Sequence, residues 1–123
     1  MKSYSANLLN YFFHLDHVGI IDAGNGVYCI EEGSPEQGNV IKLAVMQTDH
    51  KLYLARFQCY GNVTLLAACE YICRWLEGKT VLEASHLTAE QILKALQLSR
   101  LHIHIAVRLV DLVKKVIAEI QMQ

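Results

Sequence analysis

The chain has 123 residues, which fits a single domain spanning residues 1–123 and is too short for two ordinary ones. Hydrophobic residues make up 53% and charged residues 19% of the chain, which excludes a disordered tail or a charged linker. The formal net charge is -1, whereas a nucleic-acid binder usually has a clear basic excess. No apolar stretch approaches the roughly 18 to 20 residues of a membrane span, and no secretory signal is expected. The four cysteines are expected to be free thiols in a cytoplasmic protein.

The first predicted element is a short amphipathic helix over residues 3–14, with Ser3 or Ser5 as its cap. Its apolar positions recur at helical spacing and are Leu8, Leu9, Phe12 and Phe13. The glycine-rich segment from 19 to 33 predicts one irregular strand with tight turns.

Two further strands are predicted over residues 39–47 and 51–60, joined by a hairpin turn at Thr48-Asp-His50. In the second of these strands, Leu52, Leu54, Arg56 and Gln58 alternate with Lys51, Tyr53, Ala55, Phe57 and Cys59. This alternation predicts a strand with two different faces.

After Gly61 the apolar period becomes helical, and Gly78 ends the predicted helix. One apolar stripe runs along this helix through Leu65, Leu66, Cys69, Ile72, Cys73 and Leu76. Residues 79–85 predict a short helical turn.

Thr88 is expected to cap another helix, with Gln91 completing a capping box, and a long last helix is expected from about Leu101 to Ile120. Its buried face is predicted to contain Ile105, Leu109, Leu112, Val113, Val116 and Ile117. Because strands come early and helices late, we expect an α+β fold. Its small antiparallel sheet would have three strands, with helices packed on one face.

The cysteines divide into structural and candidate functional residues. Cys69 and Cys73 lie on the apolar stripe, where a free thiol behaves as a small hydrophobe, and Cys29 is also interpreted as structural. Cys59 comes just before Gly61, where a loop could expose its thiol, so it is a candidate functional residue.

The histidines give only weak metal signals. His102 and His104 would point to nearly opposite sides on a helix and to one side of an extended segment, and a solvated or hydrogen-bonded pair is predicted. His14 and His17 are predicted to lie at the surface. The sequence has no zinc-type pair of cysteine pairs, no nucleophile elbow and no glycine-rich phosphate loop.

The order of elements and several short motifs together resemble the IscU/NifU N-terminal family of iron–sulfur cluster assembly scaffolds. The motifs are Tyr4-Ser5, Val18-Gly19, Gly33–Leu43, Ala55–Phe57 with Tyr60-Gly61, Trp75–Thr80 with Glu83-Ala84, and Ile103-His104. The resemblance covers almost the whole chain and implies the IscU/NifU-like fold with a long C-terminal helix.

The positions that bind the cluster in this family carry other residues here. The family holds its cluster, or a zinc ion, with cysteine thiolates and an Asp or His. The resemblance places these ligands at Gln37, Asn39, Asn62, His104 and Ile105, so His104 is retained and the thiolates are absent. Because clusters and structural zinc depend on anionic sulfur, no cofactor is expected at this site.

The resemblance therefore implies a non-catalytic interaction or regulatory protein related to these scaffolds. Its partner would be a cysteine desulfurase, another assembly factor or a second copy of the chain, and neither nucleic acid nor a membrane. One alternative is a carrier of a cluster or metal with non-standard ligands such as Cys59 and His104. Another is a sulfur-transfer protein with a persulfide on Cys59.

The N-terminal helix carries more large apolar residues than one face of a short helix needs. The candidate partner surface is Tyr4, Leu8, Tyr11 and Phe12. The alternative is that this helix simply packs on the sheet.

Overall fold

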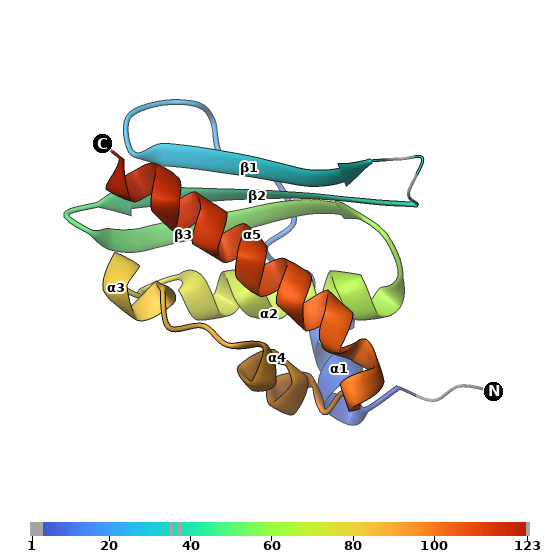
Figure 1. Ribbon diagram of the computed structural model, residues 1–123. Coiled ribbons are helices and arrows are strands. Elements are labelled where there is room, and N and C mark those ends of the chain that lie inside the picture. Colours follow the sequence, from blue (N-terminus) through green and yellow to red (C-terminus); the bar gives the residue numbers. More distant parts are fainter. Residues whose placement is uncertain (1–3, 35, 37, 123) are drawn as a thin grey trace.

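The computed structural model describes residues 4–34, 36 and 38–122 (Figure 1). Within these residues the strands are β1 (Val27–Ser34), β2 (Asn39–Thr48) and β3 (Lys51–Tyr60). The helices are α1 (Ala6–Phe12), α2 (Val63–Leu76), α3 (Val81–Ala84), α4 (Ala89–Leu96) and α5 (Ile103–Gln121), with a 3₁₀ turn at Arg100–His102. None of the helices described is both long and apolar enough to cross a bilayer.

The sheet is antiparallel and has the strand order β1-β2-β3. Thr48 pairs with Lys51, so β2 and β3 are joined by a two-residue turn. Asp49 and His50 in this turn have φ angles of 53° and 64°. Positive φ at both central residues is the geometry that matches the twist of a hairpin, and the predicted turn is confirmed.

A bulge in β3 breaks the predicted alternation of its side chains. Met46 pairs with Leu54 while Gln47 pairs with Leu52, so Tyr53 is left without a partner in the ladder. The extra residue turns Leu52 onto the inner face that also carries Ala55. The predicted alternation of side chains between the two faces is therefore correct from Leu54 to the end of β3. It is wrong for Lys51 and Leu52, which come before the bulge.

The segment before β1 is not the irregular strand that the sequence predicts. β1 begins only at Val27, and Val18 forms an isolated parallel bridge with Phe57. The Gly19 N–H donates to the Phe57 carbonyl at 2.9 Å, and the Phe57 N–H donates to the His17 carbonyl at 2.9 Å. This short segment thus occupies the free edge of β3 without becoming a strand.

The helix starts are set by side-chain caps. Ser5 caps α1, which is shorter than predicted, and Ser3 lies outside the described residues. Thr88 caps α4 as predicted, but the Gln91 amide donates to the Tyr71 hydroxyl at 2.8 Å. The full capping box lies instead at the start of α3, where Thr80 and Glu83 bond reciprocally.

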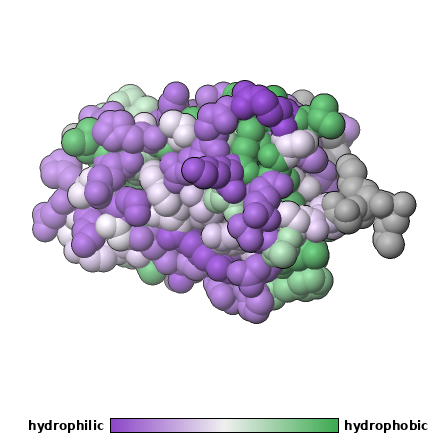
Figure 2. Space-filling view, turned by 90° about the horizontal axis from the view of Figure 1, so that it is seen from below, coloured by the Kyte–Doolittle hydropathy of each residue, from purple (hydrophilic) through white to green (hydrophobic). Residues whose placement is uncertain are grey.

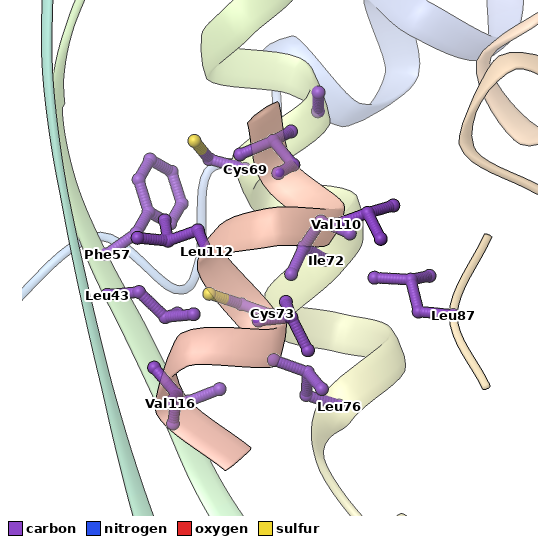
Figure 3. Close-up of a cluster of buried hydrophobic side chains, with 14 of the residues drawn as sticks. Leu43, Phe57, Cys69, Ile72, Cys73, Leu76, Leu87, Val110, Leu112 and Val116 are labelled. Atoms are coloured by element: carbon purple, nitrogen blue, oxygen red, sulfur yellow. The ribbon is translucent and has the colours of Figure 1, made fainter. Parts of the chain in front are cut away.

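All the described helices lie on one face of the sheet, as predicted, with α2 against β3 and α5 against β1 (Figure 1). Figure 3 shows the core between them, where Leu43 and Phe57 from the sheet meet Cys73 from α2 and Leu112 from α5. Burial of one such leucine or phenylalanine side chain contributes about 1.5–3 kcal/mol. The predicted buried face of the last helix is confirmed, although its first turn is 3₁₀ and α5 starts at Ile103.

Candidate functional site

A cavity of about 200 Å³ opens where three parts of the chain meet: the start of β2, the corner between β3 and α2, and the first turns of α5. The described residues that line it are Gly38, Asn39, Gly61, Asn62, Leu65, His104, Ile105 and Arg108. Four ligand positions implied by the family resemblance are therefore neighbours in space. The fifth, Gln37, lies outside the described residues.

Local structure fixes each wall of this cavity. Asn39 is the first residue of β2 and pairs with Ser34 at the end of β1. The Asn62 side-chain oxygen accepts from the Leu65 N–H at 2.9 Å and so caps α2. A Cβ on Gly61 would lie 2.7 Å from a methyl carbon of the Leu65 side chain, so a larger residue at this corner would have to displace that side chain.

Arg108 brings a positive charge to the cavity. Its Nη2 donates to the Asn39 side-chain oxygen at 2.8 Å, and its Nε donates to Glu32 of β1 at 2.8 Å. The Arg108 and Glu32 side chains are 28% and 24% exposed, so this ion pair is only partly screened by water. The sequence reasoning missed Arg108, although its place four residues after His104 puts both on one helix face.

The chain was compared with protein families, with curated proteins and with solved structures. The profile of the NifU-like N terminal domain matches residues 3–123. The chain belongs to this family. It is 28% identical to the iron-sulfur cluster assembly scaffold protein IscU of Escherichia coli K12, over 95% of this chain and 93% of that protein. It is 27% identical to the scaffold protein IscU of Haemophilus influenzae, over 95% of this chain and 94% of that protein.

Solved structures of NifU-like proteins share the fold. The N-terminal part of a nitrogen-fixing NifU-like protein from Brucella abortus superposes with a TM-score of 0.75 at 12% identity, covering 97% of this chain and 94% of that chain. An iron-sulfur cluster assembly scaffold for the SUF system from Fervidobacterium islandicum gives 0.69 at 14% identity, covering 93% and 96%. These comparisons bear out the IscU/NifU-like fold.

The cysteines of this NifU-like domain do not gather in the cavity. Cys69 and Cys73 are buried in the core, as predicted, whereas Cys29 is exposed on β1 and does not have the buried structural role expected of it. Cys59 is half-buried and its side chain packs against the core. Burial raises the pKa of the Cys73 thiol well above its ordinary value, and the Glu70 carboxylate raises it further.

The alternative metal site of Cys59 and His104 stays a prediction with little geometric support. Cys59 is absent from the described residues that line the cavity, while His104 is present. Across the described part of the chain, no group of three or more His, Cys, Asp and Glu side chains is arranged to hold a metal ion.

His17 does not lie free at the surface as predicted. Its Nδ1 lies 2.7 Å from Glu70, its Nε2 lies 2.8 Å from Glu77, and the Glu70 side chain is fully buried. Arg74 pairs with Glu70 and Arg56 pairs with Glu77, each at 2.7 Å. Each ring nitrogen of His17 thus faces a carboxylate oxygen, and the sequence reasoning missed this network of acidic and basic side chains. His14, by contrast, is exposed as predicted.

His102 and His104 both line a second, larger cavity of about 510 Å³, because the chain between them passes from the 3₁₀ turn into α5. His104 is exposed. The Nδ1 atom of His102 is buried and has no hydrogen-bond partner among the described residues. The prediction of a solvated or hydrogen-bonded pair is therefore wrong for this atom of His102.

The candidate partner surface is only partly exposed. Leu8 is buried at 1% exposure and belongs to the core, so it is wrong as a surface residue. Tyr11 is half-buried, with its ring 5.6 Å from that of Tyr71, and Phe12 is also half-buried. Tyr4 remains 40% exposed.

Helix α1 packs mainly on α2 and also contacts α4. The Ser5 hydroxyl donates to the Leu96 carbonyl at 2.6 Å, which ties the start of α1 to the end of α4. Figure 2 shows the face of the molecule seen from below as mainly hydrophilic, with small hydrophobic groups separated by polar residues. On this face, a partner surface would consist of a few apolar residues within a polar surround.

Proposed function

We propose that this NifU-like domain has lost the cluster-binding ligands of its family and acts without catalysis, by binding a protein partner. The observation that carries this proposal is the guanidinium of Arg108 on the side chain of Asn39, inside the cavity where the family resemblance places the cluster. A bound metal ion would need anionic ligands in this cavity, and the Arg108 side chain places a positive charge there instead.

The donor set does not fit an iron–sulfur cluster or a structural zinc ion. Asn39 and Asn62 offer neutral amide oxygens, Ile105 offers no donor, and the Asn62 oxygen already caps α2. One imidazole, that of His104, remains. Thiolates are the ligands that hold iron–sulfur clusters, and the charge of Arg108 opposes any further cation.

The test is the metal content of the protein purified without oxygen. Iron, zinc and acid-labile sulfide are measured per chain, together with the absorption spectrum, and we expect none at stoichiometric level. A near-stoichiometric metal content in a folded protein contradicts the proposal. Loss of that metal in Cys59→Ala would then favour the alternative carrier with Cys59 and His104.

A restored site provides the matched control. The variant carries Gln37→Cys, Asn39→Asp, Asn62→Cys and Ile105→Cys, and a second version adds Arg108→Leu. We expect zinc binding only after the thiolates return, and tighter binding once the Arg108 charge is removed. Circular dichroism checks each variant, because Asn62→Cys also removes the cap of α2.

The proposed partner is a cysteine desulfurase, with another assembly factor or a second copy of the chain as the other candidates. The names of the relatives support this choice, because they describe scaffolds of cluster assembly. Near α1, Tyr4 is exposed and Phe12 is half-buried, and these two aromatic residues support a contact there. The four free cysteines agree with a reducing cytoplasm as the place of action.

Binding to a purified cysteine desulfurase is measured by titration calorimetry, and self-association by analytical ultracentrifugation. Tyr4→Ala and Phe12→Glu are expected to weaken the complex at least tenfold, about 1.4 kcal/mol. Tyr53→Ala is the matched control, since Tyr53 is an exposed aromatic residue on β3. Equal loss in all three variants, or no complex at all, contradicts this part of the proposal.

A further inference from the structure

The cavity between β2, α2 and α5 has basic side chains on its walls and, among the described residues that line it, no carboxylate. Arg108 and His104 lie one turn apart on α5, so both are on the same side of the helix. His104 is exposed, and its ring has an N–H to donate even when it is neutral. The chain as a whole has a formal net charge of -1, so this gathering of basic groups is local.

Arg108 still has N–H groups to offer a ligand. Its Nε donates to Glu32 and its Nη2 to Asn39, each at 2.8 Å, while its Nη1 has no hydrogen-bond partner among the described residues. The two bonds hold the plane of the guanidinium, a group whose geometry suits the oxygens of a phosphate or a carboxylate. Glu32 offsets part of the charge, but it is not one of the described residues that line the cavity.

The N-terminus of α2 adds backbone donors next to Arg108 and His104. Asn62 caps this helix by accepting from the Leu65 N–H, and both residues line the cavity. The first N–H groups of a helix have no partner within it and favour a negative charge nearby. The first turn of α2 contains no acidic residue, so the helix does not supply that charge itself.

The second cavity, of about 510 Å³, adjoins the first, because the two share Asn62, His104 and Ile105 on their walls. Its other polar walls are formed by Tyr4, Thr64, Ser99 and His102. None of the described residues around it is acidic. A molecule that extends from the first cavity into the second would lie beside the His102 ring, whose buried Nδ1 has no partner among the described residues.

We propose that the cavity at Arg108 binds a phosphate group. The guanidinium, the His104 ring and the N–H groups at the start of α2 approach from different elements, and a phosphate group accepts through several oxygens at once. The group belongs either to inorganic phosphate or to a small phosphate ester whose body lies in the second cavity. Such a site is separate from the proposed function, because phosphate binding needs no protein partner.

The proposal is tested by NMR titration of the isotope-labelled chain with inorganic phosphate. Sodium phosphate replaces sodium chloride at constant ionic strength, and a chelator is present so that no metal ion can bridge. We expect saturable shifts of the backbone amide signals of residues that line the cavity, namely Gly38, Asn39, Gly61 and His104. Arg108→Leu is expected to raise the dissociation constant by at least about tenfold.

Arg100→Leu is the matched control. Arg100 is an exposed arginine that pairs with Glu90, and it is not among the residues that line either cavity. This variant removes the same charge as Arg108→Leu and is expected to bind phosphate within about twofold of the parent, because an exposed charge is screened by salt.

Phenyl phosphate distinguishes the two sources of the phosphate group. Additional shifts at Ser99 and Leu101, which line the second cavity, indicate an ester, whereas the same shifts as with inorganic phosphate indicate the free ion. Shifts that do not saturate, that avoid the cavity residues, or that weaken equally in Arg100→Leu and Arg108→Leu overturn the proposal. The titration of the parent chain locates the site whether or not Arg108→Leu folds. A failure here leaves the proposed function standing, because metal content and partner binding test that function.

Discussion

At the scale of single residues, Arg108 connects three elements through two hydrogen bonds, from α5 to Glu32 on β1 and to Asn39 on β2. A metal ion held by residues from several loops would make a similar connection. We therefore expect Arg108→Leu to lower the free energy of unfolding by about 1–2 kcal/mol, because Glu32 loses its charged partner in a partly buried place. Urea unfolding followed by circular dichroism measures this change.

A double-mutant cycle isolates the contribution of the ion pair. Glu32→Gln is combined with Arg108→Leu. The double variant is expected to lose less unfolding free energy than the sum of the losses in the two single variants. Arg108→Lys serves as the conservative control, since one ammonium cannot reach both partners in the same planar geometry. An Arg108→Leu protein as stable as the parent would mean that the guanidinium is not a structural link.

His17 makes the second prediction at this scale. Its ring lies between Glu70 and Glu77, and Glu70 has no contact with water. His17→Ala is expected to lower the free energy of unfolding by about 2–4 kcal/mol. The buried Glu70 carboxylate then loses the contact with the His17 ring and keeps its contact with Arg74. The control is His14→Ala at an exposed position, where a change within about 0.5 kcal/mol is expected in the same urea experiment. Equal effects of the two substitutions would contradict the role given to the network.

At the scale of elements, hydrophobic periodicity was enough to predict α2 and α5, because each buries one regular face, while the Thr88 cap predicted α4 and the turn at Thr48-Asp-His50 predicted the β2–β3 hairpin. It failed where a single backbone event changes the pattern. The bulge at Tyr53 moves Leu52 to the inner face, and two backbone hydrogen bonds at Phe57 hold the segment around Val18 at the edge of β3. Neither event leaves a periodic mark in the sequence.

The candidate site was predictable in part, from short motifs in the sequence. Asn39, Asn62, His104 and Ile105 were named from motifs, and the fold brings them to one cavity. Arg108 and the network around His17 depend on distant side chains meeting in space. In the sequence, Glu32 and Arg108 are far apart and look like ordinary surface charges.

The β2–β3 turn offers a prediction at the element scale. Asp49 and His50 both adopt positive φ, a conformation that costs less for glycine than for a residue with a Cβ. His50→Gly is expected to raise the free energy of unfolding by about 0.5 kcal/mol, since the bond from the Val81 N–H to the His50 carbonyl is kept. The thermal midpoint measures the gain.

Gly26→Ala is the opposite control for this turn variant. Gly26 also has positive φ, and a Cβ there would lie 2.5 Å from the backbone oxygen of Gln47, so this substitution is expected to lower the thermal midpoint. A loss of stability in His50→Gly would show that the histidine side chain contributes more than the strain it causes.

At the scale of the whole molecule, the domain has two groups of polar side chains that connect distant segments. The Arg108 group joins α5 to β1 and β2, and the His17 group joins the segment after α1 to α2 and β3. If the domain binds no metal, as proposed above, such connections and the apolar core have to hold the loops in place. The stability of this protein is therefore expected to depend on pH and little on chelators.

The pH dependence follows from Glu77. Burial raises its pKa, but hydrogen bonds from the Ala55 N–H, His17 and Arg56 outweigh this and hold the pKa below its ordinary value of 4.5. A carboxyl with a lower pKa in the folded than in the unfolded state stabilises the fold above its unfolded pKa. This stabilisation is lost as the pH falls through the folded pKa. The free energy of unfolding is therefore expected to be level near neutral pH and to fall below about pH 4.5.

Urea unfolding of the parent chain and of Glu77→Gln, from neutral pH down to about pH 3, measures this effect. The variant is expected to be less stable at neutral pH and to lose less of its stability on acidification, because position 77 no longer takes up a proton. Glu83, whose pKa is lowered by its hydrogen bonds with Thr80, keeps part of the slope in both proteins. Glu119→Gln, at an exposed position on α5, is the control and should keep the slope of the parent. If Glu77→Gln and Glu119→Gln give the same slope, the acid sensitivity lies elsewhere and the His17 network does not set it.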